Sequence, residues 1–226
     1  MAEDKSPARF RLYLITDRRL AAVNGGLIAA VEGALAAGAE IGPAASIGVQ
    51  LREKDLEGRA LYELALALER VCSRFGAPLI VNDRVDVAIA AGAHGVHLSS
   101  TSFAVADART LLGSSRLIGV STHNLEEVTA AAVNGADFAV FGPVYDPLSK
   151  GAYGPAKGLS ALANAVTAAK PVPVYALGGI NESRASEITT LPSNSRPFGV
   201  AAIGAVFGSA NPGVAVRGIL RALSRP

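Results

Sequence analysis

The 226-residue chain is half hydrophobic and carries a net charge of +2, with few aromatic residues and no tryptophan. A chain of this length can bury one sizeable core, and so slight a charge without a dense basic run argues against nucleic-acid binding. Cys72 is the single cysteine, which excludes an internal disulfide and a cysteine-based metal cluster. No apolar run is long enough to span a membrane. We expect a soluble cytoplasmic protein with a disordered tail over residues 1–9 and one domain over residues 10–226.

Short apolar runs alternate with helical patterns along the first half of the chain. Residues 10–15 alternate in hydrophobicity and end at a polar loop, which predicts a strand. Residues 26–37 and 61–75 have the spacing of helices, which end at Gly38 and Gly76. Between and after these helices we predict a strand that ends in the segment 50–54, strands over 79–81 and 95–98, and a short helix over 84–91.

The second half continues the same alternation. Helices are predicted over residues 105–112 and 159–169, and strands over 117–120, 138–141, 171–177 and 198–203. Asn124 is the expected N-cap of a further helix, with Glu127 completing a capping box. Asn181 and Asn211 are expected to cap two more helices. A long loop over residues 142–158 separates the sixth strand from its helix.

Eight strands, each followed by a helix, form one repeating βα pattern without a linker or a composition break. The strands are short and apolar on both faces, as in a parallel sheet covered by helices. This pattern predicts an α/β fold, a single-domain (β/α)8 TIM barrel. An open doubly wound sheet is the alternative.

Polar side chains gather where the predicted strands end, which is the end of a barrel that carries active sites. Gln50, Arg52 and Lys54 alternate along the second strand and would share one face. One amide and two cations on one face could hold a phosphate or a diphosphate. The alternative is a strand end whose cations reach solvent.

Other strand ends allow both a functional and a structural interpretation. Gly178 and Gly179, and Gly204 after the last strand, would let a phosphate approach the backbone, or they could form ordinary tight turns. His97 could be a structural hydrogen bonder. His123 could be catalytic or could support the cap of the next helix.

The ordered set of strand-end motifs resembles the thiamin phosphate synthase/TenI family, from about residue 11 to residue 207. The similar segments are LYLITD at 12–17, QLREK at 50–54, VNDRVD at 81–86, GVHL at 95–98, GVSTH at 119–123, FGP at 141–143, Lys150, and ALGGI at 176–180.

The resemblance to the synthase implies that a thiazole phosphate nitrogen attacks the methylene of a hydroxymethylpyrimidine diphosphate and that diphosphate leaves. Asp83 matches one of two magnesium-binding aspartates, so Mg²⁺ is expected if the protein is a synthase. The glycine loops at Gly178, Gly179 and Gly204 would hold the thiazole phosphate. The residues that match its diphosphate-binding positions are Gln50, Arg52, Lys54, Asn82, Ser121 and Lys150.

The sequence departs from the synthase pattern in the loop after the fourth strand. The second magnesium-binding aspartate is replaced by Ser102, within a serine-rich loop that resembles TenI-type thiazole tautomerases. That reaction moves a proton and needs no metal, and His123, together with Ser121, matches its expected catalytic position. A second departure is Gly204, where both branches of the family usually carry serine.

Three hypotheses therefore stand, with a TenI-like thiazole tautomerase favoured. The alternatives are a thiamin phosphate synthase that uses Asp83 alone for Mg²⁺, and a non-catalytic paralogue that binds phosphorylated ligands. The expected partners are small phosphorylated thiazole or pyrimidine substrates, and the resemblance implies a homodimer.

Overall fold

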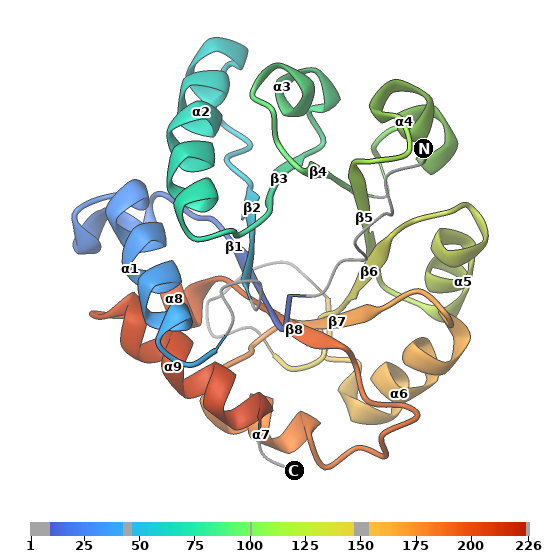
Figure 1. Cartoon of the computed structure of the whole chain (residues 1–226). Helices are drawn as coiled ribbons and strands as arrows, with labels where there is room; N and C mark the ends of the chain where they lie inside the picture. The colour runs from blue at the N-terminus through green and yellow to red at the C-terminus, as the bar shows by residue number, and fades with distance from the viewer. Residues whose placement is uncertain (1–9, 43–46, 100, 147–153, 225–226) are drawn as a thin grey trace.

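The computed structural model describes residues 10–42, 47–99, 101–146 and 154–224. Eight parallel strands form a closed barrel in sequence order, with the first strand paired to the last. Figure 1 shows the strands at the centre and the helices around them. The prediction of a single (β/α)8 barrel is confirmed, and the open sheet is excluded. The strands are β1 (Leu12–Ile15), β2 (Ile47–Leu51), β3 (Leu79–Asn82), β4 (Gly95–Leu98), β5 (Leu117–Thr122), β6 (Phe138–Phe141), β7 (Val174–Leu177) and β8 (Gly199–Ala202).

The helices follow the expected order, with two short elements that the sequence pattern did not indicate. These are a 3₁₀ helix, η1 (Leu20–Asn24), and the four-residue α8 (Gly204–Phe207). Both are too short to produce a recognisable helical repeat. The others are α1 (Leu27–Ala39), α2 (Gly58–Arg74), α3 (Val85–Ala90), α4 (Val105–Leu112), α5 (Leu125–Val133), α6 (Gly158–Ala168), α7 (Glu182–Ile188) and α9 (Pro212–Leu223).

Asparagine side chains cap three of these helices, as predicted. Asn124, Asn181 and Asn211 each accept a hydrogen bond from a backbone N–H in the first turn of α5, α7 and α9. β7 begins at Val174 rather than at residue 171, because proline has no N–H to give to a strand ladder.

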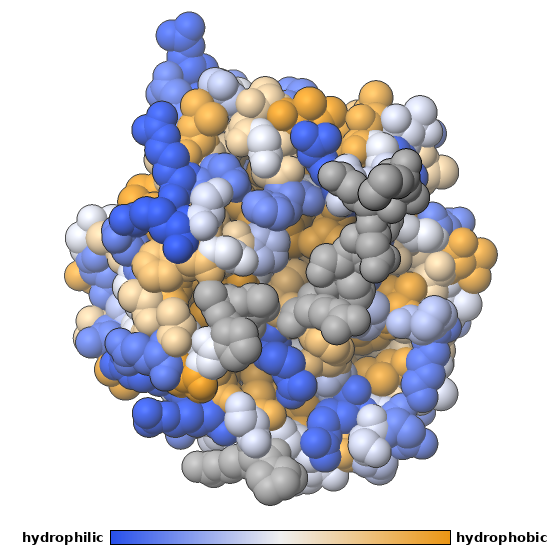
Figure 2. Space-filling model, in the orientation of Figure 1, coloured by the Kyte–Doolittle hydropathy of each residue, from blue (hydrophilic) through white to orange (hydrophobic). Residues whose placement is uncertain are grey.

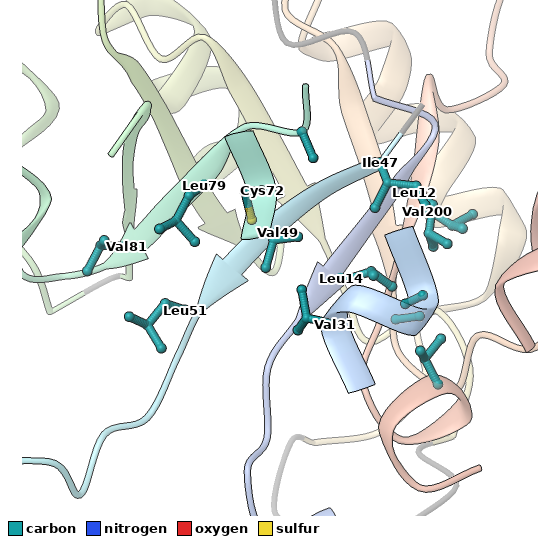
Figure 3. Packing of buried hydrophobic residues seen from close by; sticks show 14 of the residues in the cluster. Leu12, Leu14, Val31, Ile47, Val49, Leu51, Cys72, Leu79, Val81 and Val200 are labelled. Atoms are coloured by element: carbon teal, nitrogen blue, oxygen red, sulfur yellow. The ribbon is translucent and has the colours of Figure 1, made fainter. Parts of the chain in front are cut away.

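The larger part of the core lies between the outside of the barrel and the helices. Outward-facing residues such as Leu12, Val49 and Leu79 come from neighbouring strands and are fully buried. In Figure 3 they lie under Val31 of α1 and Cys72 of α2. Cys72 is buried and burial raises the pKa of its thiol to about 12, so it packs as a small hydrophobe, as expected.

A second, smaller cluster fills the inside of the barrel. The rings of Phe10, Tyr13, Phe138 and Tyr175 pack together, with centroids 4.7–5.6 Å apart in five of the six pairs. Gly119 makes room for them, because a methyl group there would overlap the ring of Phe138. This aromatic cluster supports the polar layer above it.

The face of the molecule in Figure 2 carries many hydrophilic side chains around its rim, with hydrophobic ones between them. Among the described residues, no helix is long and apolar enough to cross a membrane. The predicted disorder of residues 1–9 concerns a segment outside the described residues.

Candidate active site

A cavity of about 310 Å³ opens at the carboxyl ends of the strands, on the side of β1 and β5 to β8. This volume lies at the lower end of the range for small-molecule sites. Its lining combines apolar strand ends with polar side chains and glycine loops. The lining residues are Asp17, Leu20, Arg52, Ser121, Thr122, His123, Val140, Gly142, Pro143, Leu177, Gly178, Gly179, Ile180, Ala201, Ala202, Ile203, Gly204 and Ala205.

Inward-facing polar side chains of β2 and β3 form a hydrogen-bonded row beside this cavity. Gln50 is 1% exposed and its Nε2 donates to Asn82 Oδ1 at 2.9 Å. Asn82 Nδ2 donates in turn to Asp83 Oδ2 at 2.8 Å. Gln50 Oε1 is buried and has no hydrogen-bond partner among the described residues, so it is an acceptor that a ligand N–H or a water could satisfy.

The segment after Gln50 does not continue as a strand. β2 ends at Leu51, and residues 52–55 form a loop and a turn in which Lys54 is exposed. Arg52 lines the cavity, whereas Lys54 does not. The prediction that the alternation reaches Lys54 is therefore wrong, because strand alternation holds only while the ladder continues.

Beyond the end of β2, Glu53 makes tertiary contacts that the sequence pattern did not indicate. Glu53 is 7% exposed and accepts from the backbone N–H and the guanidinium of Arg18, at 3.0 and 3.1 Å. Arg18 also forms a bidentate pair with Asp55, at 2.5 and 2.8 Å. This ion-pair network ties the loop after β1 to the loop after β2. It was missed because the partners are 35 and 37 residues apart.

Asp83 adopts a left-handed backbone conformation, with φ 59°, which is uncommon for a residue other than glycine and recurs at functional sites. Its Oδ1 accepts hydrogen bonds from the backbone N–H of Ser99, at 3.2 Å, and from the hydroxyl of Ser102. Ser102 therefore stands against the carboxylate, at the position where the resemblance leads one to expect a second aspartate.

This donor set offers Mg²⁺ one carboxylate. No group of three or more histidine, cysteine, aspartate or glutamate side chains within the described ranges could hold a metal ion. Asp83 would fit Mg²⁺ as one of its ligands only if substrate phosphate oxygens and waters supplied the rest. The serine donors instead stabilise the Asp83 carboxylate by direct hydrogen bonds.

His97 lies on the inward face of β4, 2% exposed, between Tyr13 and Ser121. Its Nε2 is 2.9 Å from Ser121 Oγ, and its Nδ1 is 3.4 Å from the hydroxyl of Tyr13. The pKa of His97 is lowered to about 3, chiefly by burial; Asp83 opposes this shift and the nearby Arg52 adds to it. The imidazole is therefore neutral at physiological pH.

His123 lies at the margin of the cavity with its side chain half exposed. Its Nδ1 is 2.9 Å from Glu127 Oε2, and the same carboxylate oxygen accepts from the His123 backbone N–H at 2.7 Å. Glu127 thus fixes the ring, and its backbone N–H donates to Asn124 Oδ1 as predicted. The predicted capping box is not completed, because the Glu127 carboxylate accepts from Asn124 Nδ2 and from the His123 backbone N–H rather than from the backbone N–H of Asn124. Both sequence-based interpretations of His123, as a cap support and as a residue facing the site, agree with this geometry.

The glycine loops form the other wall of the cavity. Gly178 and Gly179 have φ of 106° and 62°, which side chains rarely adopt. Gly204 begins α8, and a Cβ there would find its nearest neighbour, a Leu20 methyl, at 4.0 Å. The usual serine would therefore fit sterically at this position. Lys150 lies outside the described residues.

Arg184 of α7, like Glu53, makes contacts near the site that the sequence pattern did not indicate. Its Nη1 donates to the carbonyls of Gly179 and Asp146, at 2.6 and 3.1 Å, and its guanidinium lies 4.9 Å from the ring centroid of Tyr145. It joins the loop after β7 to the loop after β6. No local pattern marks such a contact, because both carbonyls belong to the backbone.

Comparisons with known proteins agree over nearly the whole chain. The family described as thiamine monophosphate synthase matches residues 12–206. A Geobacter sulfurreducens protein provisionally named a thiamine-phosphate synthase is 50% identical over 221 residues, covering 95% of this chain and 94% of the relative. The thiamine-phosphate synthase of Xanthobacter autotrophicus is 37% identical over 217 residues, covering 96% of this chain and 97% of the relative.

A solved structure supports the same assignment. Thiamine phosphate pyrophosphorylase from Pyrococcus furiosus is 30% identical, covers 96% of each chain and superposes with a TM-score of 0.81. The profile match, the identities and the barrel agree with one another, so the chain belongs to the thiamine monophosphate synthase family.

Proposed function

We propose that the protein is a thiamine-phosphate synthase, which joins a hydroxymethylpyrimidine diphosphate to a thiazole phosphate and releases diphosphate. The observation that carries the proposal is the adjacency of two regions at one end of the barrel. One is the cavity with the glycine loops of Gly178, Gly179 and Gly204, and the other is the row of Gln50, Asn82 and Asp83. Arg52 links the two regions, because it lines the cavity and lies two residues after Gln50 in the chain.

The glycine loops suit the thiazole phosphate, because loops after the seventh and eighth strands of barrels often bind phosphate through backbone N–H groups. The side chains of Arg52, Asn82 and Ser121 suit the diphosphate. The thiazole nitrogen forms a bond to the pyrimidine methylene carbon as the bond from that carbon to the diphosphate oxygen breaks. A cation and hydrogen-bond donors beside the departing oxygens stabilise the negative charge that develops there.

Asp83 would hold Mg²⁺ together with diphosphate oxygens, and the ion would supply positive charge to the leaving group. Arg52 supplies positive charge from the chain itself. Lys54 is exposed in the turn after Arg52, and a substrate diphosphate that extends beyond the cavity would bring the two cations to the same anion.

The test is a direct assay of the joining reaction. Purified protein is incubated with both substrates and Mg²⁺, and diphosphate and thiamine phosphate are quantified. Arg52→Ala should lower kcat/KM by 10²-fold or more, roughly the effect of losing one charge-stabilising donor. Arg59→Ala removes an exposed arginine of α2 outside the cavity and is the matched control. The absence of product at saturating substrates and Mg²⁺ would contradict the proposal.

A second candidate function is favoured by one specific observation. The hydroxyl of Ser102 stands against Asp83, and among the described residues Asp83 belongs to no cluster of three or more histidine, cysteine, aspartate or glutamate side chains suited to a metal ion. A thiazole tautomerase needs a proton carrier rather than a metal, and His123, held by Glu127, faces the cavity margin. Turnover of the thiazole carboxylate phosphate that His123→Ala abolishes and His94→Ala preserves would establish it. Binding of either substrate without any turnover would instead identify a non-catalytic paralogue.

A further inference from the structure

Three side chains from β1, β4 and β5 form a hydrogen-bonded series from the barrel core to the cavity. Tyr13 is fully buried in the aromatic cluster, and its hydroxyl lies 3.4 Å from His97 Nδ1. His97 Nε2 lies 2.9 Å from Ser121 Oγ, and Ser121 lines the cavity. Strand alternation places all three on the inward face.

The direction of these hydrogen bonds follows from what each atom can donate. Burial raises the pKa of Tyr13 well above its usual value, so its hydroxyl keeps its hydrogen. Within the described part of the chain, His97 Nδ1 is the single hydrogen-bond partner of that hydroxyl. A buried hydroxyl hydrogen needs an acceptor, so Tyr13 donates and Nδ1 accepts.

The tautomer of His97 is then determined. A neutral imidazole carries one hydrogen, and an acceptor at Nδ1 leaves that hydrogen on Nε2. Nε2 therefore donates to Ser121 Oγ. Since the serine oxygen accepts this hydrogen bond, its own hydroxyl hydrogen is available to point elsewhere.

We propose that Tyr13 and His97 are positioning residues that hold Ser121 as a hydrogen-bond donor toward an oxyanion in the cavity. The identity of that oxyanion as a diphosphate or phosphate group of the substrates rests on the proposed function. The direction in which the Ser121 hydroxyl donates does not rest on the proposed function, because it follows from the hydrogen bonds of the free protein. In this arrangement His97 is not a general base, because Nε2 carries the hydrogen and Tyr13 covers Nδ1.

The first test determines the tautomer of His97 in the wild-type protein. Long-range ¹H–¹⁵N spectra of uniformly ¹⁵N-labelled protein report the tautomer of each histidine. His97→Gln identifies the resonance of His97 by its disappearance. We expect a neutral ring protonated at Nε2 from pH 6 to pH 8. A ring protonated at Nδ1, or a charged ring, would overturn the inference.

The second test measures binding of inorganic pyrophosphate by calorimetry. Ser121→Ala should weaken binding by about tenfold, the lower end for a hydrogen bond to a charged group. Tyr13→Phe should weaken it less, because both tautomers of His97 then become accessible. The double variant should bind no more weakly than Ser121→Ala alone, because Tyr13 acts through Ser121.

Tyr62→Phe is the matched control, because Tyr62 lies on α2 outside the cavity, and its affinity should equal that of the wild type. Thermal unfolding of every variant checks that the barrel persists. Losses of affinity that multiply in the double variant would overturn the positioning role, and a wild type that does not bind pyrophosphate would overturn the choice of ligand. If the joining reaction fails while the tautomer and the coupling hold, only the proposed function is lost.

Discussion

Ser102→Asp tests whether the hydrogen bond from Ser102 stabilises the charged Asp83 carboxylate. In the structure, Ser102 Oγ donates to Asp83 Oδ1 and accepts from the backbone N–H of Ser99, at 2.7 Å. An aspartate at position 102 could still accept from Ser99. It could not donate to Asp83, and its charge would face another carboxylate. We therefore expect the variant to be less stable than the wild type without divalent cations, and to regain stability with Mg²⁺.

The magnitude follows from two contributions. A hydrogen bond to a charged group contributes about 1.5–3 kcal/mol, which the substitution removes. Two like charges about 4 Å apart repel by about 1 kcal/mol in water and about 4 kcal/mol near a protein surface. Because both side chains are partly exposed and can turn toward solvent, we expect a total loss of about 3 kcal/mol. For a chain of this size, that lowers Tm by about 6–12 °C.

The assay is thermal unfolding at low ionic strength, with EDTA and then with increasing Mg²⁺. Two facing carboxylates suit Mg²⁺, and binding at one hundred times Kd restores about 2.7 kcal/mol. Ser102→Asn is the matched control, since it adds similar volume without charge and should not respond to Mg²⁺ more than the wild type does. A variant as stable as the wild type in EDTA, or indifferent to Mg²⁺, would refute the reasoning.

Three further predictions concern the fold. Gly119→Ala should cost about 1–3 kcal/mol by overpacking the interior aromatic cluster, whereas Gly33→Ala, in open space on α1, should stabilise by up to about 1 kcal/mol; urea unfolding measures both. His97 has a pKa of about 3 in the folded protein and about 6.5 in an unfolded chain, so below about pH 6.5 the unfolded chain binds a proton that the folded protein does not. The free energy of unfolding should therefore fall on acidification by up to about 1.4 kcal/mol per pH unit. His97→Gln should lack this contribution. The hydrogen bonds from Arg18 lower the pKa of Asp55 below its ordinary 3.8, so the stability that they contribute is present above that pH and is lost as pH falls below it. Asp55→Asn should reduce this loss of stability in acid. A variant that loses as much stability in acid as the wild type would contradict the role of the pair.

Local patterns were sufficient to place several site residues. Gln50 was predicted to lie at the active end because it ends an apolar strand, and parallel strands of a barrel bring their carboxyl ends to one rim. The family resemblance added Asn82 and Ser121, which also stand at strand ends. The structure joins Gln50 directly to Asn82 and puts Ser121 in the wall of the cavity. The caps at Asn124 and Asn181 were recognised because a helix cap depends on only three or four adjacent residues.

Other contacts could not be read from the sequence. Lys54 was assigned to a strand face because nothing near it signals that β2 ends at Leu51. Nor does anything near Glu53 signal that its carboxylate meets Arg18, a partner 35 residues earlier. The hydrogen bonds from Arg184 to two backbone carbonyls could not be predicted either, because every residue has a backbone carbonyl and the residue type does not mark it.

By itself the sequence determined the barrel, because hydrophobic periodicity is a local signal and the alternation of strand and helix recurs eight times along the chain. It also placed Gln50, Asn82 and Ser121 at strand ends, where the structure has them. Only the tertiary structure decided how those residues are used: that Ser102 donates to Asp83, and that Tyr13 and His97 direct the hydroxyl of Ser121. Hydrogen-bond direction and charge compensation depend on atoms from distant strands meeting within about 3 Å, and residue order alone does not specify that meeting.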